Sequence, residues 1–207
     1  MKKFLVILVG LVILVSLDAV AQVALKTDGQ DPKYVETIKG RAQKIVVGLK
    51  LTDTQVAENV RNIIANRYFL LNDIHSKYDK KTQQDALNAE LYKHHFELAS
   101  ALAQYLTDEQ IDAVKDGMTF GRLKRDYQAT QDMIPSLSEY EKKQVLIWLK
   151  EAREYAMDAA DSKGKHFWFD KYRGRTNNWL SARGYDLKKE RDNWMKRAEE
   201  KQAKEKK

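Results

Sequence analysis

The segment between His166 and Trp179 has a high density of aromatic, arginine and asparagine side chains. Four of them would share one face of a helix, since they recur at about one-turn spacings: Trp168, Tyr172, Arg175 and Trp179. Aromatic rings can stack on sugar rings, and Arg175, Asn177 and Asn178 could donate to sugar hydroxyls. The pattern predicts a carbohydrate-binding surface. The alternative is core packing, because aromatic stripes at helical spacing usually face a bundle interior.

A second cluster consists of Glu151, Glu154 and Asp158, whose spacings of three and four residues place their carboxylates on one helix face. Such proximity is what the acid and base of a glycosidase require. Surface pairing with Lys150 and Arg153 is the alternative. Arg175 lies on the aromatic helix face, and a charge there is costly to bury without a partner. We therefore expect Arg175 to lie in a polar pocket or to pair with one of these carboxylates.

Other chemistries lack their motifs. The four histidines are not spaced for a metal site, and there is no phosphate-binding loop, dinucleotide glycine pattern or cysteine nucleophile. We therefore expect neither a metal nor a cofactor.

The elements that position these residues are predicted to be helices. Only two prolines occur, and apolar residues recur with the helical period, which indicates an all-α, irregular bundle of six to seven helices in one domain. The expected helices are Pro32–Leu49, one from Thr52, Leu87–Tyr105, Thr107–Asp116, Arg125–Ile134, one from Ser138, and Ser162–Arg183. On the helix from Ser138, Trp148 and Tyr155 are expected to face inward.

Helix boundaries rest on local signals. Thr52, Thr107 and Ser138 are each followed three residues later by Gln or Glu, the capping-box pattern. Gly117 is expected to end a short helix in a left-handed conformation, followed by a loop over residues 118–124.

The first residues resemble a secretory signal. Lys2 and Lys3 precede an apolar run, and Ala19-Val20-Ala21 fits signal-peptidase cleavage before Gln22. We expect a signal peptide over residues 1–21, a helical domain over 22–185 and a charged C-terminal helix or tail over 186–207. The chain has no cysteine, which excludes disulfides and a lipoprotein anchor.

Compartment and charge limit the partners. The net charge of +7 is mixed with acidic residues, and export argues against nucleic acid as the partner. The mature protein is expected to be soluble in the periplasm or outside the cell, with no stable membrane insertion.

Two resemblances extend this interpretation. The L-T-x-x-Q units at Leu51 and Leu106 are similar to those of periplasmic chaperones of the Spy and CpxP type, although a capping box explains them equally. Nearly the whole mature chain resembles an uncharacterised family of exported proteins from polysaccharide-degrading bacteria, a domain of unknown function to which sugar binding is ascribed. Four segments carry the second resemblance: 68–75, 115–119, 151–158 and 171–185.

The family resemblance implies a role near glycan breakdown and supplies no catalytic residues. Together with the aromatic segment, it leads us to expect an exported accessory protein that binds carbohydrate in polysaccharide utilisation. A holdase-like chaperone is the alternative, and an unrecognised carbohydrate-active enzyme comes third. A chaperone should expose a broad apolar concavity, whereas a sugar site should be a smaller pocket with aromatic and polar groups.

Overall fold

The computed structural model describes residues 21–205, and within them every regular element is a helix. The helices are α1 (Pro32–Leu49), α2 (Thr54–Lys77), α3 (Gln84–His94), α4 (Glu97–Leu102), α5 (Asp108–Met118), α6 (Arg122–Met133), α7 (Glu139–Met157), α8 (Ser162–Ala182) and α9 (Leu187–Glu205). The all-α fold class is confirmed. The predicted signal peptide lies almost entirely outside the described residues.

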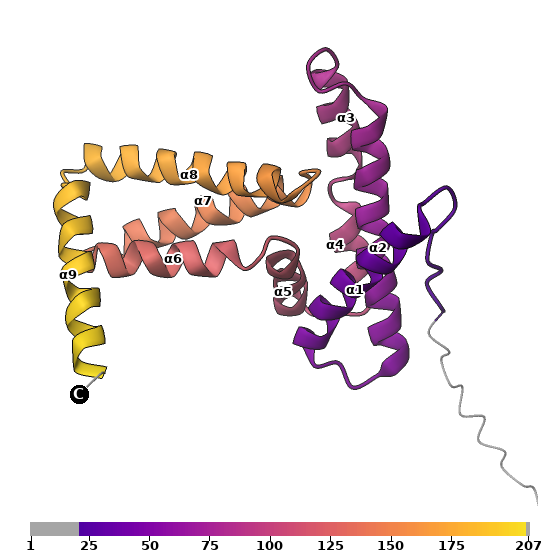
Figure 1. Ribbon diagram of the computed structural model, residues 1–207, viewed down its shortest axis with the longest axis horizontal. Coiled ribbons are helices and arrows are strands. Elements are labelled where there is room, and N and C mark those ends of the chain that lie inside the picture. The colour runs from indigo at the N-terminus through magenta and orange to yellow at the C-terminus, as the bar shows by residue number, and fades with distance from the viewer. Residues whose placement is uncertain (1–20, 206–207) are drawn as a thin grey trace, which may run out of the picture.

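The helices form two halves set at an angle (Figure 1). In the first half α1, α3 and α4 pack on α2, and α5 packs on α1. In the second half α7 and α8 form a hairpin flanked by α6, with α9 crossing its far end. Contacts of α5 with α6 and α7 join the halves. The turn between α7 and α8 thereby faces the first half, and residues from both sides of this junction line the candidate site.

Each half has its own apolar core because each helix buries one stripe. Buried residues of the first core include Ile38, Ile64 and Leu102, and those of the second include Leu149 and Phe169. Within residues 21–205, no helix combines the length and hydrophobicity needed to cross a membrane.

Two of the three predicted capping boxes are present. Thr107 and Ser138 each accept from the amide three residues on, and the side chains of Gln110 and Glu141 accept from the cap amide in return. The prediction of a capping box at Thr52 was wrong, because α2 begins one residue later, with Asp53 as its N-cap. The Asp53 carboxylate accepts from two backbone amides of the first turn.

Gly117 was wrongly expected to be left-handed. It lies within α5, where a Cβ atom would come within 2.9 Å of Ile45 Cγ1 on α1. Glycine therefore permits the close approach of α1 and α5. The left-handed residues at this turn are Phe120 and Gly121, with φ of 60° and 62°. They make a tight turn, so α6 begins at Arg122 and the loop is shorter than expected.

The helix predicted from Leu87 to Tyr105 is two helices, interrupted at His95 and Phe96. Residues 22–185 consequently contain eight helices, more than the six or seven expected. The break turns the His95 side chain toward the second half of the molecule. Residues Leu187–Glu205 of the charged C-terminal segment form α9, where Arg197 donates to the Asp132 carbonyl at the end of α6.

The extended segment before α1 is held by three asparagines of α2. Asn59 and Asn66 each donate to and accept from its backbone, and Asn62 donates to the Val23 carbonyl at 2.7 Å. Val23 and Leu25 point into the first core between these bonds. The asparagine amides thus pair with the chain as a neighbouring strand would.

Candidate functional site

A cleft of about 930 Å³ lies between the two halves. The first half contributes the end of α2, the following turn, α3 and the break before α4, and the second half contributes the end of α7 and the start of α8. The lining residues include His75, Lys80, Gln84, Asn88, Tyr92, His95, Phe96, Glu151, Glu154, Tyr155, Asp158, Asp161, Phe167 and Trp168. A volume of this size accommodates a ligand of several hundred daltons.

The walls of the cleft are aromatic and open to solvent. On the second half, Tyr155 stacks on Trp168 with ring centroids 4.5 Å apart, and Phe167 meets Trp168 edge to face at 5.6 Å. On the first half, Tyr92 and Phe96 form another edge-to-face pair. Phe96 and Phe167 are 63% and 58% exposed. Together with Tyr92 and Tyr155 they gather several exposed rings around one cleft.

The floor of the cleft is organised around Asp158 at the end of α7. One carboxylate oxygen accepts from Arg67 Nη2 at 2.5 Å and the other lies 2.6 Å from His95 Nδ1. The hydrogen bond to Asp158 raises the pKa of His95 above its usual value, although burial opposes this. Because Arg67 and His95 come from the first half, Asp158 ties the two sides of the cleft together.

The His75 ring has a defined tautomer. Its Nε2 lies 2.7 Å from the Asp158 carbonyl, and a carbonyl can only accept, so Nε2 carries the proton. In the neutral ring Nδ1 is then an acceptor, and it is buried without a hydrogen-bond partner among the described residues.

Two further carboxylates of the cleft are also paired with cations. Lys115 Nζ donates to both oxygens of Glu154, at 2.9 and 3.0 Å, and Arg175 lies 3.4 Å from Glu151. Arg153 lies 3.7 Å from Glu154, as the predicted pairing requires, but it is buried at 3% exposure and not on the surface. Its closer partners are Asp112 and Asp116 of α5, and these contacts hold the two halves together behind the cleft.

Lys165 lies beneath the cleft, 5% exposed, in the first turns of α8. Its ammonium donates to the Ala156 carbonyl at 3.2 Å and lies 6.0 Å from the centre of the Tyr68 ring. Burial lowers the pKa of Lys165 to about 8. A cation placed here adds to the positive charge that surrounds Asp158.

The structure brings together part of the set predicted from sequence. Trp168, Glu151, Glu154 and Asp158 line the cleft. Tyr172 lies on the same helix but is buried at 6% exposure, where burial and a hydrogen bond to Glu151 raise its pKa. Four predicted residues lie further along α8 and do not line the cleft: Arg175, Asn177, Asn178 and Trp179.

Several cleft residues were not predicted. His95 and Phe167 were missed, and Tyr155 was expected to face inward but is 48% exposed. Sequence signals existed for some of them: His75 ends one of the segments that carry the family resemblance, and Phe167 adjoins Trp168. The contact between His95 and Asp158 joins residues 63 positions apart and has no local signal.

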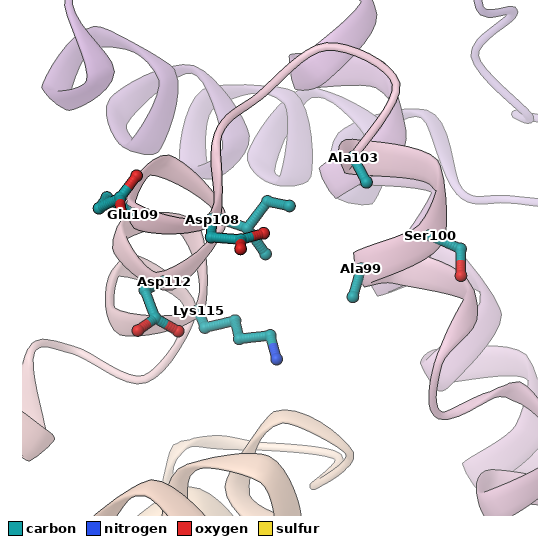
Figure 2. A pocket seen from close by; sticks show the side chains of 8 residues that line it. Ala99, Ser100, Ala103, Asp108, Glu109, Asp112 and Lys115 are labelled. Carbon is teal, nitrogen blue, oxygen red and sulfur yellow. The ribbon is translucent and has the colours of Figure 1, made fainter.

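A second hollow, of about 490 Å³, lies between α4 and α5 (Figure 2). Small side chains of Ala99 and Ala103 face charged residues of α5 across it. Its central charges are already engaged, since Asp112 pairs with Arg153 and Lys115 with Glu154. It also lacks aromatic rings. Over residues 21–205, no cluster of three or more potential ligands is arranged for a metal ion.

Comparison with known proteins identifies one family. A family model described as "Protein of unknown function (DUF3826)" matches residues 35–85 and 77–200, which together include every helix that lines the cleft. No curated protein matches the chain.

Proposed function

Because the chain belongs to the DUF3826 family, whose function is unknown, we propose a function from the cleft itself: the protein binds carbohydrate there, as an exported accessory protein in polysaccharide utilisation. The observation that carries this proposal is the combination of exposed aromatic walls with a hydrogen-bonded, ion-paired floor. Sugars present both an apolar ring face and a rim of hydroxyls, and this cleft offers a surface for each.

The polar groups of the floor suit hydroxyl ligands. Asp158 and Glu154 are held in place by cations, so their remaining acceptor positions are oriented before a ligand arrives. Gln84 and Asn88 line the same cleft with amide groups that can donate or accept. Preorganised donors and acceptors reduce the entropy lost on binding.

We propose binding in preference to cleavage on geometric grounds. In a glycosidase one of the two carboxyl groups that flank the scissile bond acts as an acid and the other as a base or nucleophile. Here Lys115 Nζ donates to both oxygens of Glu154, and His95 Nε2 lies 3.8 Å from Oε2 of the same carboxylate, so this group is already engaged. Glu151, Glu154 and Asp158 are each paired with a cation, an arrangement suited to holding a ligand.

The same floor argues against a holdase-like chaperone. Such a protein presents a continuous apolar concavity to unfolded segments. Carboxylates occupy the middle of this cleft, and an apolar segment lying across them would leave them desolvated, at a cost of several kcal/mol.

The test is a binding screen of the mature protein. We expect plant cell-wall polysaccharides, both neutral and acidic, to include at least one that binds in an array and in isothermal titration calorimetry. Phe167→Ala should weaken that binding by about tenfold, since a stacked ring contributes about 1 to 1.5 kcal/mol beyond its area. Its unfolding free energy should change by less than about 1 kcal/mol, because the ring is 58% exposed.

A matched control is Met195→Ala on α9, an apolar side chain of similar exposure at 53%. It should leave both binding and stability unchanged. If no saccharide binds, or if Met195→Ala weakens binding as much as Phe167→Ala does, the cleft is not a carbohydrate site.

A further inference from the structure

Aromatic rings continue beyond the cleft along the groove between α7 and α8. We define the α7–α8 seam by five rings: Tyr140, Trp148 and Tyr155 of α7, and Trp168 and Trp179 of α8. The two helices run antiparallel, so the rings near the start of α7 lie beside those near the end of α8, and the rings near the end of α7 lie beside those near the start of α8. Trp168 stacks on Tyr155 at the cleft, and Trp179 lies 6.2 Å from Tyr140 at the opposite end.

Two arginines connect these rings. The Arg175 guanidinium lies 4.7 Å from the centre of the Trp148 ring, and that ring meets Trp179 edge to face at 5.2 Å. The Arg183 guanidinium lies 5.0 Å from Trp179 and 5.7 Å from Tyr140. Flat apolar surfaces therefore alternate with rigidly held hydrogen-bond donors along the seam.

The seam is open to solvent at both ends and along its length. Tyr140 is 62% exposed, and Trp148, Trp168 and Trp179 are each partly exposed. The eleven-residue offset from Trp168 to Trp179 corresponds to about 17 Å at about 1.5 Å per residue. This distance exceeds the size of a single sugar ring.

We propose that the α7–α8 seam is an extension of the carbohydrate site, so that the ligand is a linear, uncharged glycan chain running from the cleft toward Tyr140. This inference rests on the proposed function of the cleft. It names a class of ligand, a chain of several neutral sugars, and assigns binding roles to Tyr140 and Trp148.

Charge on the seam selects a neutral chain. Arg175 is paired with Glu151, and Arg183 donates to Glu141 at 2.7 Å. The charges of these two arginines are thus compensated, while their remaining N–H groups can still donate to hydroxyls. A third cation, the Lys171 ammonium, lies 4.8 Å from the centre of the Trp168 ring. A polyanion such as nucleic acid would need a row of cations without carboxylate partners along its path, which a single lysine does not supply.

The experiment measures affinity against chain length. Xylo-, cello- and manno-oligosaccharides, from the disaccharide to the octasaccharide, are titrated into the mature protein by calorimetry. For the series that binds, the affinity of the wild type should rise with length until the chain spans the seam. Tyr140→Ala and Trp148→Ala should each weaken the octasaccharide about tenfold and leave the disaccharide unchanged. Phe167→Ala, in the cleft, should weaken both.

Two variants separate a loss of binding contacts from a loss of folding or an unspecific effect of truncation. Tyr140 is exposed in the first turn of α7, so its truncation is compatible with folding even if Trp148→Ala is destabilised. Ile147→Ala, the exposed neighbour of Trp148 on the same helix, is the matched control and should change nothing.

Failure of this inference differs from failure of the proposed function. Affinity that is independent of chain length, or binding restricted to galacturonan and other acidic chains, would overturn the neutral-chain seam and leave the cleft as a sugar site. A change of oligomeric state in Trp148→Ala, measured by sedimentation, would show that the seam contacts a second copy. Absence of any saccharide binding would overturn both.

Discussion

Replacing the buried Lys165 with methionine should stabilise the protein at neutral pH. Lys165 is charged there despite being 5% exposed, and burial lowers its pKa from 10.5 to about 8. At about 1.36 kcal/mol per pKa unit, this difference corresponds to about 3 kcal/mol of unfavourable free energy in the folded state. Methionine fills a similar volume without the charge.

The hydrogen bond lost in this variant should matter little. The acceptor of the ammonium is the Ala156 carbonyl, which also accepts from the amides of Asp158 and Ala159 at the end of α7. Removal of the ammonium therefore leaves no unpaired carbonyl. We expect Lys165→Met to raise the unfolding free energy by about 2 kcal/mol, somewhat less than the full electrostatic cost.

The sign of the pH dependence provides an independent check. Between the folded pKa of about 8 and the unfolded value of 10.5, the unfolded chain binds more protons at Lys165 than the folded chain does. This residue therefore makes the wild type more stable as pH rises through that window. The advantage of Lys165→Met should be full below about pH 8 and should disappear by about pH 10.5.

The assay is urea denaturation followed by circular dichroism at neutral and alkaline pH. Lys163→Met, which replaces an exposed lysine on the same helix, is the control and should have no effect. A variant less stable than the wild type at neutral pH, or an advantage that persists at alkaline pH, would refute the reasoning. Either result would mean that attraction to nearby carboxylates exceeds the cost of burial.

Two further perturbations test how the halves are built and joined. Gly117→Ala should lower the unfolding free energy by about 1 to 2 kcal/mol, because the new Cβ would come within 2.9 Å of Ile45. In an Ile45→Ala background the same change should be neutral or stabilising. Thermal unfolding of the wild type, the two single variants and the double variant measures this coupling, and equal effects of Gly117→Ala in both backgrounds would show that the contact is unimportant. His95→Gln should lower the unfolding free energy by about 1 to 2 kcal/mol at acidic pH, because the charged pair with Asp158 is lost. The pKa of His95 is raised in the folded state. The stability difference between the wild type and the variant should therefore be full below about pH 6.5 and should fall as pH rises through that raised value. A pH-independent difference in urea denaturation would show that His95 acts through packing alone.

Local signals in the sequence were sufficient for the fold class and for most helix boundaries. Capping at Thr107 and Ser138, proline at the start of α1 and the apolar period of each helix act within a few residues, so they can be read without knowing what packs against them. These signals gave the wrong boundary where two neighbouring residues can both act as the N-cap. Asp53 and Thr52 can both cap α2, and the carboxylate, which accepts two amide hydrogens, prevails.

Tertiary structure decided what the sequence left open about the site. Trp168 and Tyr172 lie on the same helical stripe, yet Tyr172 packs in the core of the second half at 6% exposure, whereas Trp168 is partly exposed and lines the cleft.

The cleft itself also depends on packing. Its two sides are held together in part by the contacts of Asp158 with Arg67 and His95 of the other half, which span 91 and 63 residues of chain. Periodicity places a residue on a face of its own helix, but the neighbour of that face depends on how distant helices pack.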